Sequence, residues 1–186
     1  MARVIPFRES LSSSWVRSEM GPSMSNLRAR DALERARRLF LERPSAARKP
    51  NTTATAVWQE GLQFVTTGPA GEKVLTDMPA PLGGDGVGAN PGWLLRAAMA
   101  SCTATAIAMQ AAMRGIELKS LEVSVDSELD ARGVVGIGGV PNSLSDLRMT
   151  IKLGADNVPE SQLRELAEWA ATESTVNKTL REGPPV

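Results

Sequence analysis

The stretch from Asn90 to Gly115 constrains the fold of this chain more than any other segment. It carries helix signals at both ends and almost no charge between them. Asn90 can cap a helix with its side-chain oxygen, and Pro91 suits the first helical turn. Gly115 suits the left-handed position that follows a helix. The residues between them are rich in Ala and Met, and predict about six turns of helix buried on nearly every side.

Cys102, near the middle of this stretch, is the only cysteine in the chain. A single cysteine cannot form an internal disulfide. Residues 1–23 also lack the continuous apolar core of a secretory signal. We therefore expect an intracellular, cytoplasmic protein in a reducing compartment.

Composition excludes several classes of function. The chain has no histidine, which removes the Ser-His-Asp triad and most zinc or iron sites, so we expect no metal and no cofactor. Basic and acidic residues balance at 21 each, which leaves no electrostatic footprint for nucleic acid or an anionic membrane. Arg96 and Gln110 limit the apolar run of the long helix, which falls short of the about 20 residues of a membrane span.

The chain divides into three parts. Residues 1–23 are Ser-rich and aperiodic, and we expect a disordered extension. Residues 24–50 predict an amphipathic helix, with Leu33 and Phe40 on its apolar face, followed by a basic linker. This helix must dock on the body of the domain or on a second subunit. Residues 51–186 form the main domain.

Strand patterns lie on both sides of the long helix. Residues 52–58, 62–67 and 73–78 predict an antiparallel meander. Residues 118–130 and 147–153 alternate apolar and polar side chains, with Leu129 and Leu147 among the inward-facing positions. The first of these two strands has an acidic wet face and the second a basic one, which favours antiparallel pairing.

The end of the chain predicts two helices. Asn157 and Glu160 form a capping-box pattern ahead of a helix, and residues 174–181 predict a shorter one. Because strands come in meanders and helices lie between them, the fold class is α+β. One antiparallel sheet covers a single side of an apolar helix, so we expect a homodimer with a shared core.

Three separated segments resemble the OsmC/Ohr family. The pattern Asn90-Pro-x-x-Leu-Leu-x-Ala-Ala-x-Ala-Ser-Cys102 resembles its first-cysteine helix, and residues 118–133 resemble the segment that follows. Residues 174–180, Ser-Thr-Val-Asn-Lys-Thr-Leu, are similar to its second-cysteine segment, Cys-Pro-Val-x-x-Thr-Leu. The resemblance covers about residues 52–182. It implies an OsmC-like intertwined homodimer with paired central helices, sites at the subunit interface, and reduction of hydroperoxides by paired cysteines.

The resemblance also assigns site positions, most of which are altered here. Cys102 matches the peroxidatic cysteine, whose thiolate becomes a sulfenic acid. Ser174 stands in place of the resolving cysteine, Gly92 in place of a glutamate, and Gln59 in place of the arginine that this glutamate pairs with. Arg148 or Arg181 could instead supply the positive charge near the thiolate that this arginine provides. Arg96 lies six positions before Cys102, on a different helix face.

Several functions remain open. The first is a thiol-dependent peroxide reductase that detoxifies organic hydroperoxides with Cys102 alone and takes its electrons from an external thiol. The alternative is a non-catalytic OsmC-like dimer that binds a small apolar ligand at the subunit interface, with Cys102 in the lining. A purely structural or partner-binding dimer, resting on the N-terminal helix, is a third. In each, Ser174 is expected to cap a helix, since no base that would activate it is evident.

Overall fold

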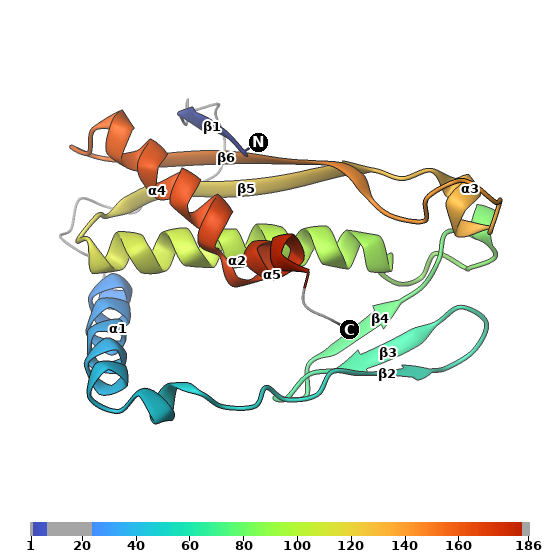
Figure 1. Ribbon diagram of the computed structural model, residues 1–186, viewed down its shortest axis with the longest axis horizontal. Coiled ribbons are helices and arrows are strands. Elements are labelled where there is room, and N and C mark those ends of the chain that lie inside the picture. Colours follow the sequence, from blue (N-terminus) through green and yellow to red (C-terminus); the bar gives the residue numbers. More distant parts are fainter. Residues whose placement is uncertain (1, 7–23, 184–186) are drawn as a thin grey trace.

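A long central helix is the axis of the molecule. The computed structural model describes residues 2–6 and 24–183, and α2 (Pro91–Met113) runs through its middle with a sheet on either side (Figure 1). The Asn90 side chain accepts hydrogen bonds from the backbone N–H groups of Gly92 (2.9 Å) and Trp93 (3.3 Å). Gly115 has φ +68°. Both end signals of the helix are therefore confirmed.

The burial predicted for α2 is only partly correct. One face packs in the core through Met99, Thr103, Ile107, Ala111 and Ala112. The opposite face forms an exposed stripe, which we define as Ala98, Ser101, Thr105, Ala108 and Met109. The strand β5 (Leu118–Glu128) and the helices α4 (Glu160–Glu173) and α5 (Thr175–Glu182) pack on α2, but no described element covers the stripe.

The main sheet has the predicted antiparallel pair. β5 pairs with β6 (Ser145–Ala155), and the inward side chains Met149, Ile151 and Leu153 are buried. On the wet face Lys152 pairs with Glu122 at 2.7 Å. Leu129 and Leu147 depart from the prediction because both are exposed: Leu129 follows the last residue of β5, and Leu147 borders an open cavity.

The third strand of this sheet, β1 (Ala2–Pro6), was not predicted. It runs parallel to β6, with Ala2 opposite Met149 and Pro6 opposite Leu153. Backbone hydrogen bonds to a free sheet edge require no side-chain periodicity, so no pattern announces such a strand. Residues 7–23, most of the extension expected to be disordered, lie outside the described residues.

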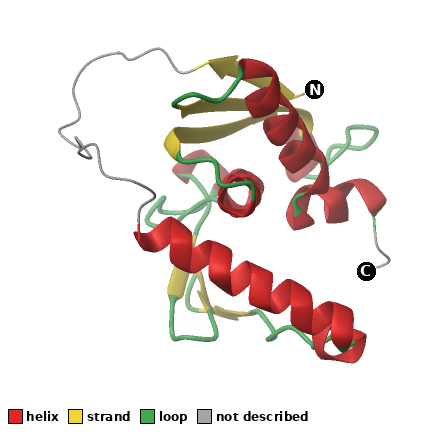
Figure 2. Cartoon of the chain, turned by 90° about the vertical axis from the view of Figure 1, so that its left-hand side faces the viewer, coloured by secondary structure: helices red, strands yellow, loops and turns green. Residues whose placement is uncertain are grey.

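The first long helix, α1 (Met24–Glu42), leads through η1 (Pro44–Ala47) into the linker. It contacts α2 near Gly115, and otherwise stands beside the body, as the view along α2 shows (Figure 2). Leu33 and Ala36 are half-buried, but Leu39 and Phe40 at the far end are exposed. The apolar face of α1 is thus covered over part of its length.

The predicted N-terminal meander is present as β2 (Thr55–Trp58), β3 (Phe64–Thr67) and β4 (Lys73–Thr76). This sheet lies apart from α2 (Figure 1). Val57 and Trp58 remain 55% and 62% exposed. In the single chain the meander therefore has little apolar cover.

The C-terminal helices α4 and α5 lie across α2 (Figure 1). α4 turns a fully apolar face inward, made of Leu163, Leu166, Ala167 and Ala170. The capping box predicted for it is wrong. Asn157 has φ +57°, and the N-cap is Pro159, which has no side-chain cap. Two short turns complete the α+β fold, η2 (Ala80–Leu82) and α3 (Ala131–Val134).

Candidate functional site

Cys102 lies at mid-length of α2, between the exposed Ser101 and the fully buried Thr103. Its side chain is half-buried. Among the described residues none forms a hydrogen bond with its sulfur. The thiol is therefore close to the surface of the chain and is not tied to a neighbouring group.

A buried polar cluster lies beside Cys102 and consists of Thr103, Ser174 and Asn177. The Thr103 hydroxyl donates to the Met99 carbonyl (2.8 Å), and Asn177 Nδ2 donates to Thr103 Oγ1 (2.8 Å) and to the Ala171 carbonyl (3.2 Å). Ser174 Oγ lies 3.3 Å from Thr103 Oγ1. Because the one hydroxyl hydrogen of Thr103 is used on Met99, Ser174 is the donor of this last bond. The cluster joins α5 to the helical turn that carries Cys102.

Of the three altered positions that the resemblance implies, Ser174 is the one that the fold brings near Cys102. It is the N-cap of α5, as expected, but its side chain makes no capping hydrogen bond. The hydroxyl bonds to Thr103 instead. Thr103 and Asn177 were missed as site residues, because their partners lie more than 70 positions away in sequence.

Gln59 and Gly92 lie away from Cys102 of the same chain. Gln59 is in the turn after β2, where its Nε2 donates to the carbonyls of Val57 (3.1 Å) and Trp58 (3.2 Å). Gly92 is in the first turn of α2. At about 1.5 Å of rise per residue, ten residues place it about 15 Å from Cys102 along the helix axis.

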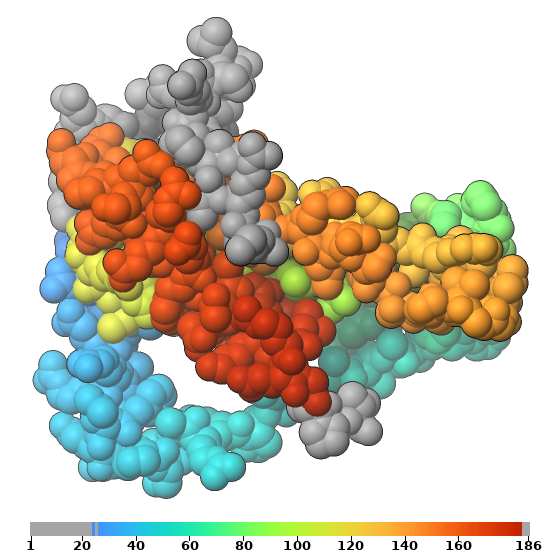
Figure 3. All heavy atoms as spheres, turned by 45° about the horizontal axis from the view of Figure 1, so that its top comes forward, coloured from blue at the N-terminus to red at the C-terminus, as the bar shows by residue number. Residues whose placement is uncertain are grey.

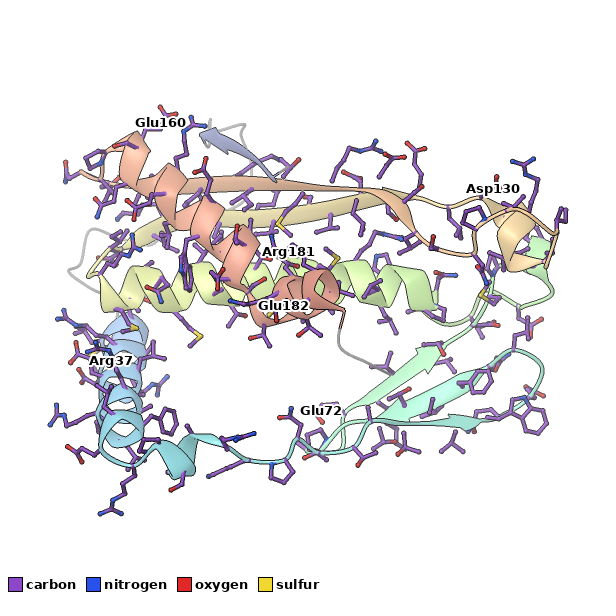
Figure 4. All side chains as sticks on the ribbon, viewed as in Figure 1. Arg37, Glu72, Asp130, Glu160, Arg181 and Glu182 are labelled. Atoms are coloured by element: carbon purple, nitrogen blue, oxygen red, sulfur yellow. The ribbon has the colours of Figure 1, made fainter. Side chains whose placement is uncertain are left out.

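The candidate replacement cations have other partners. Arg148 pairs with Glu128 at 3.4 Å on the wet face of β6. Arg181, labelled on α5 in Figure 4, donates to the carbonyls of Ala171 and Thr172 at the end of α4. Among the described residues, then, both arginines have partners other than the thiol.

A cavity of about 620 Å³ lies next to the polar cluster. Its lining is mostly apolar, and its polar members are Glu168, Thr172, Asn177 and Arg181. The Oδ1 atom of Asn177 is buried, and no described residue donates a hydrogen bond to it. Cys102 does not line this cavity.

Asp77, which the sequence did not single out, organises the loop that leads into α2. It is 2% exposed, and its carboxylate accepts backbone N–H bonds from Met78 (2.7 Å), Asp85 (3.0 Å) and Val87 (3.2 Å). Burial acts to raise the pKa of Asp77, but these backbone donors outweigh it and the pKa is lowered. Asp77 therefore holds residues 77–87 in place as an anion.

The described part of the chain holds no group of three or more acidic or cysteine side chains placed to bind a metal ion. None of its helices is long and apolar enough to cross a membrane.

The sequence model of the OsmC-like protein family matches residues 83–186, which is more than half of the chain and includes Cys102 and Ser174. The chain belongs to the OsmC-like family. The matched region contains the whole of α2 and the Cys102 that it carries.

Solved structures of the OsmC-like family share this fold. An OsmC-like protein from Mycoplasma pneumoniae matches with a TM-score of 0.60 at 16% identity, over 72% of this chain and 89% of that one. An organic hydroperoxide resistance protein from Legionella pneumophila matches with 0.53 at 22% identity, over 72% and 92%. An OsmC-like protein of unknown function from Vibrio cholerae matches with 0.56 at 16% identity, over 70% and 94%. No curated protein matches the sequence.

Proposed function

We propose that this member of the OsmC-like family is a one-cysteine, thiol-dependent reductase of organic hydroperoxides. The observation that carries the proposal is the position of Cys102, half-buried at mid-length of the central helix, where the family resemblance places the peroxidatic cysteine. The segment that begins at Ser174 docks on the same helical turn. The name of the Legionella neighbour, an organic hydroperoxide resistance protein, is consistent with this class of substrate.

The reaction requires one thiol from the protein and two from outside it. The Cys102 thiolate attacks the terminal oxygen of ROOH, an S–O bond forms, the O–O bond breaks, and ROH leaves with a proton from solvent. Ser174 cannot form a disulfide with the resulting sulfenic acid. An external thiol attacks the sulfenic sulfur instead and releases water. A second external thiol then attacks the external sulfur of the mixed disulfide, so that an external disulfide forms and Cys102 leaves as a thiol.

The proposal includes an intertwined homodimer in which the exposed stripe of α2 packs on the same stripe of a partner. The small side chains Ala98, Ser101 and Ala108 allow close helix approach. An opening next to α5 lies between this helix and the linker after α1 (Figure 3). A partner would cover this side and the uncovered meander. A reducing compartment such as the cytoplasm would supply the thiol reductant.

Sulfenic acid trapping tests the proposal. Because the chain has one thiol, a dimedone adduct after treatment with cumene hydroperoxide reports on Cys102 alone. We expect one adduct on the wild type by intact mass, none on Cys102→Ser, and an unchanged adduct on Ser101→Ala, which alters the exposed neighbour. If the folded wild-type protein formed no adduct, the proposed peroxidase function would be contradicted.

The cavity of about 620 Å³ favours a second candidate, a binding protein for a small apolar ligand. Its volume is within the usual range for ligand pockets, and Asn177 adds a polar group to an apolar lining. This cavity lies within one chain, between α2, β6, α4 and α5. Saturable binding of cumyl alcohol, together with failure to form a sulfenic acid, would favour this candidate over the peroxidase.

A further inference from the structure

Arg96 on α2 is a half-buried arginine that has no counter-ion among the described residues. Its Nη1 donates one hydrogen bond, to Ser127 Oγ at 3.1 Å. A guanidinium carries five N–H donors, so most of its capacity is unused. Other arginines of the domain are paired: Arg114 with Glu165 at 3.5 Å and Arg164 with Glu160 at 2.8 Å. Arg96 therefore presents an uncompensated positive charge.

This charge faces a cavity of about 420 Å³. The cavity is bounded by the segment after β4, the first turns of α2, the end of β5 and the loop before β6. Its other polar members are Asn90, Ser127, Asn142 and Ser143, and its apolar members include Met78, Leu129 and Leu144. No carboxylate lines it. The lining thus combines a cation, neutral hydrogen-bonding groups and an apolar wall.

Gly92 keeps the cavity open in front of Arg96. A Cβ atom at this position would lie 3.1 Å from Asn90 Oδ1, and 3.8 Å from both Arg96 Nη1 and Leu144 Cδ2, so it would stand between the guanidinium and the apolar wall. The φ of Gly92 is not in the left-handed region, so its backbone does not require glycine. Glycine disfavours helix, and here its effect is to leave space between the guanidinium and the apolar wall.

The backbone N–H groups at the N-terminus of α2 are not the groups that would bind an anion here. The side chain of Asn90 already accepts the N–H groups of Gly92 and Trp93. Attraction in this cavity therefore comes mainly from the guanidinium, which binds a planar carboxylate through two parallel hydrogen bonds.

We infer that this cavity binds a small organic carboxylate, with its anionic group on Arg96 and its apolar body against Met78, Leu129 and Leu144. Within one chain this cavity is separate from Cys102, since the six residues from Arg96 to Cys102 along α2 correspond to about 9 Å of rise. Binding there does not depend on the reactivity of the thiol, so the inference stands apart from the proposed peroxidase activity.

Phenylacetate is the probe, with phenylacetamide as its neutral analogue and inorganic phosphate as an anion without an apolar body. An NMR titration of the full chain measures each affinity. We expect phenylacetate to bind the wild type more tightly than either comparison compound. Arg96→Gln should weaken it by about tenfold, the scale of one lost charge-assisted contact. Gly92→Ala, which places a methyl group between Arg96 and Leu144, should weaken it too.

Arg148→Gln is the matched control, because it removes an exposed positive charge outside the cavity and should leave binding unchanged. The inference would be overturned if the wild type bound phenylacetamide as tightly as phenylacetate, or if Arg96→Gln bound phenylacetate as tightly as the wild type. It would also be overturned if the wild type did not bind phenylacetate. Tighter binding of phosphate would overturn the assignment to an organic carboxylate. If Arg96→Gln failed to fold, the affinity of Gly92→Ala for phenylacetate would decide. Weaker binding than in the wild type would support binding in this cavity, and unchanged binding would contradict it.

Discussion

The hydroxyl of Ser174 links the C-terminal helices to the helical turn that carries Cys102. It lies 3.3 Å from Oγ1 of Thr103, the residue after Cys102, so residues 174–180 are docked on this turn. The hydroxyl takes part in a buried hydrogen-bond cluster. The position therefore keeps a structural role, and the proposed reduction of oxidised Cys102 depends on an external thiol.

A thiol at position 174 should allow an internal disulfide with Cys102. In Ser174→Cys, peroxide treatment is expected to convert the Cys102 sulfenic acid into a bond to Cys at 174, because the Ser174 side chain contacts Thr103, the residue next to Cys102. Intact mass and thiol counting measure this as the loss of both free thiols. The variant that combines Cys102→Ser with Ser174→Cys is the control, and it should retain its one thiol. Two persistent thiols after oxidation would contradict the inferred proximity.

Thr103 should contribute to stability through its hydroxyl. Thr103→Val keeps the shape but leaves the Ser174 hydroxyl without its acceptor inside the protein. We expect the free energy of unfolding to fall by about 1–3 kcal/mol, measured by urea denaturation. Thr105→Val, which changes an exposed threonine of the same helix, should have little effect. Equal effects of the two substitutions would contradict the role of the cluster.

At the scale of elements, the sequence predicts the parts whose signals are local. The ends of α2 follow from Asn90 and Gly115, and the pairing of β5 with β6 follows from alternation and opposite charge on the wet face. β1 could not be predicted, because it is held by backbone hydrogen bonds to the edge of β6, and such bonds require no side-chain pattern. The cluster of Thr103, Ser174 and Asn177 depends on contacts between distant segments, which no local pattern encodes.

The buried carboxylate of Asp77 accepts three backbone hydrogen bonds in the loop before α2, which should make the stability of this loop sensitive to pH. The pKa of Asp77 is lowered in the folded state by its backbone donors, although burial alone would raise it. Its contribution is therefore fully present above the ordinary pKa of an aspartate, and is lost as the pH falls through the lower folded-state pKa. An uncharged amide cannot accept all of these N–H bonds, so Asp77→Asn should unfold at a lower temperature at neutral pH.

The difference in melting temperature between wild type and Asp77→Asn should shrink on acidification, measured by circular dichroism across the acid range. Asp156→Asn is the control, since Asp156 is an exposed aspartate paired with Lys119. A difference that stays constant with pH would mean that the charge of Asp77 is not what holds the loop.

At the scale of the whole molecule, the uncovered surfaces of the single chain lie on α2, on the meander and on the far end of α1. Composition and periodicity predicted an apolar central helix. They could not show which side of α2 is covered by other elements of the same chain. The structure divides α2 into a packed face and an exposed stripe, and this division gives the proposed homodimer a specific interface.

A charge in the middle of the stripe should separate the subunits. Thr105→Glu would bury a carboxylate against its symmetry-related copy, which is unfavourable without a partner cation. We expect the wild type to run as a dimer and Thr105→Glu as a monomer, by light scattering coupled to gel filtration. Ser161→Glu adds the same charge at an exposed site of α4 and should remain dimeric. A well-folded wild-type monomer would contradict the shared core.

Turnover of peroxide tests the central claim most directly. The rate of cumene hydroperoxide consumption, with dithiothreitol as the external reductant, should be well above background for the wild type. It should fall to background for Cys102→Ser, because no other thiol in the chain can react. Consumption at the same rate by both proteins, with both folded, would contradict the assignment of Cys102 as the peroxidatic residue.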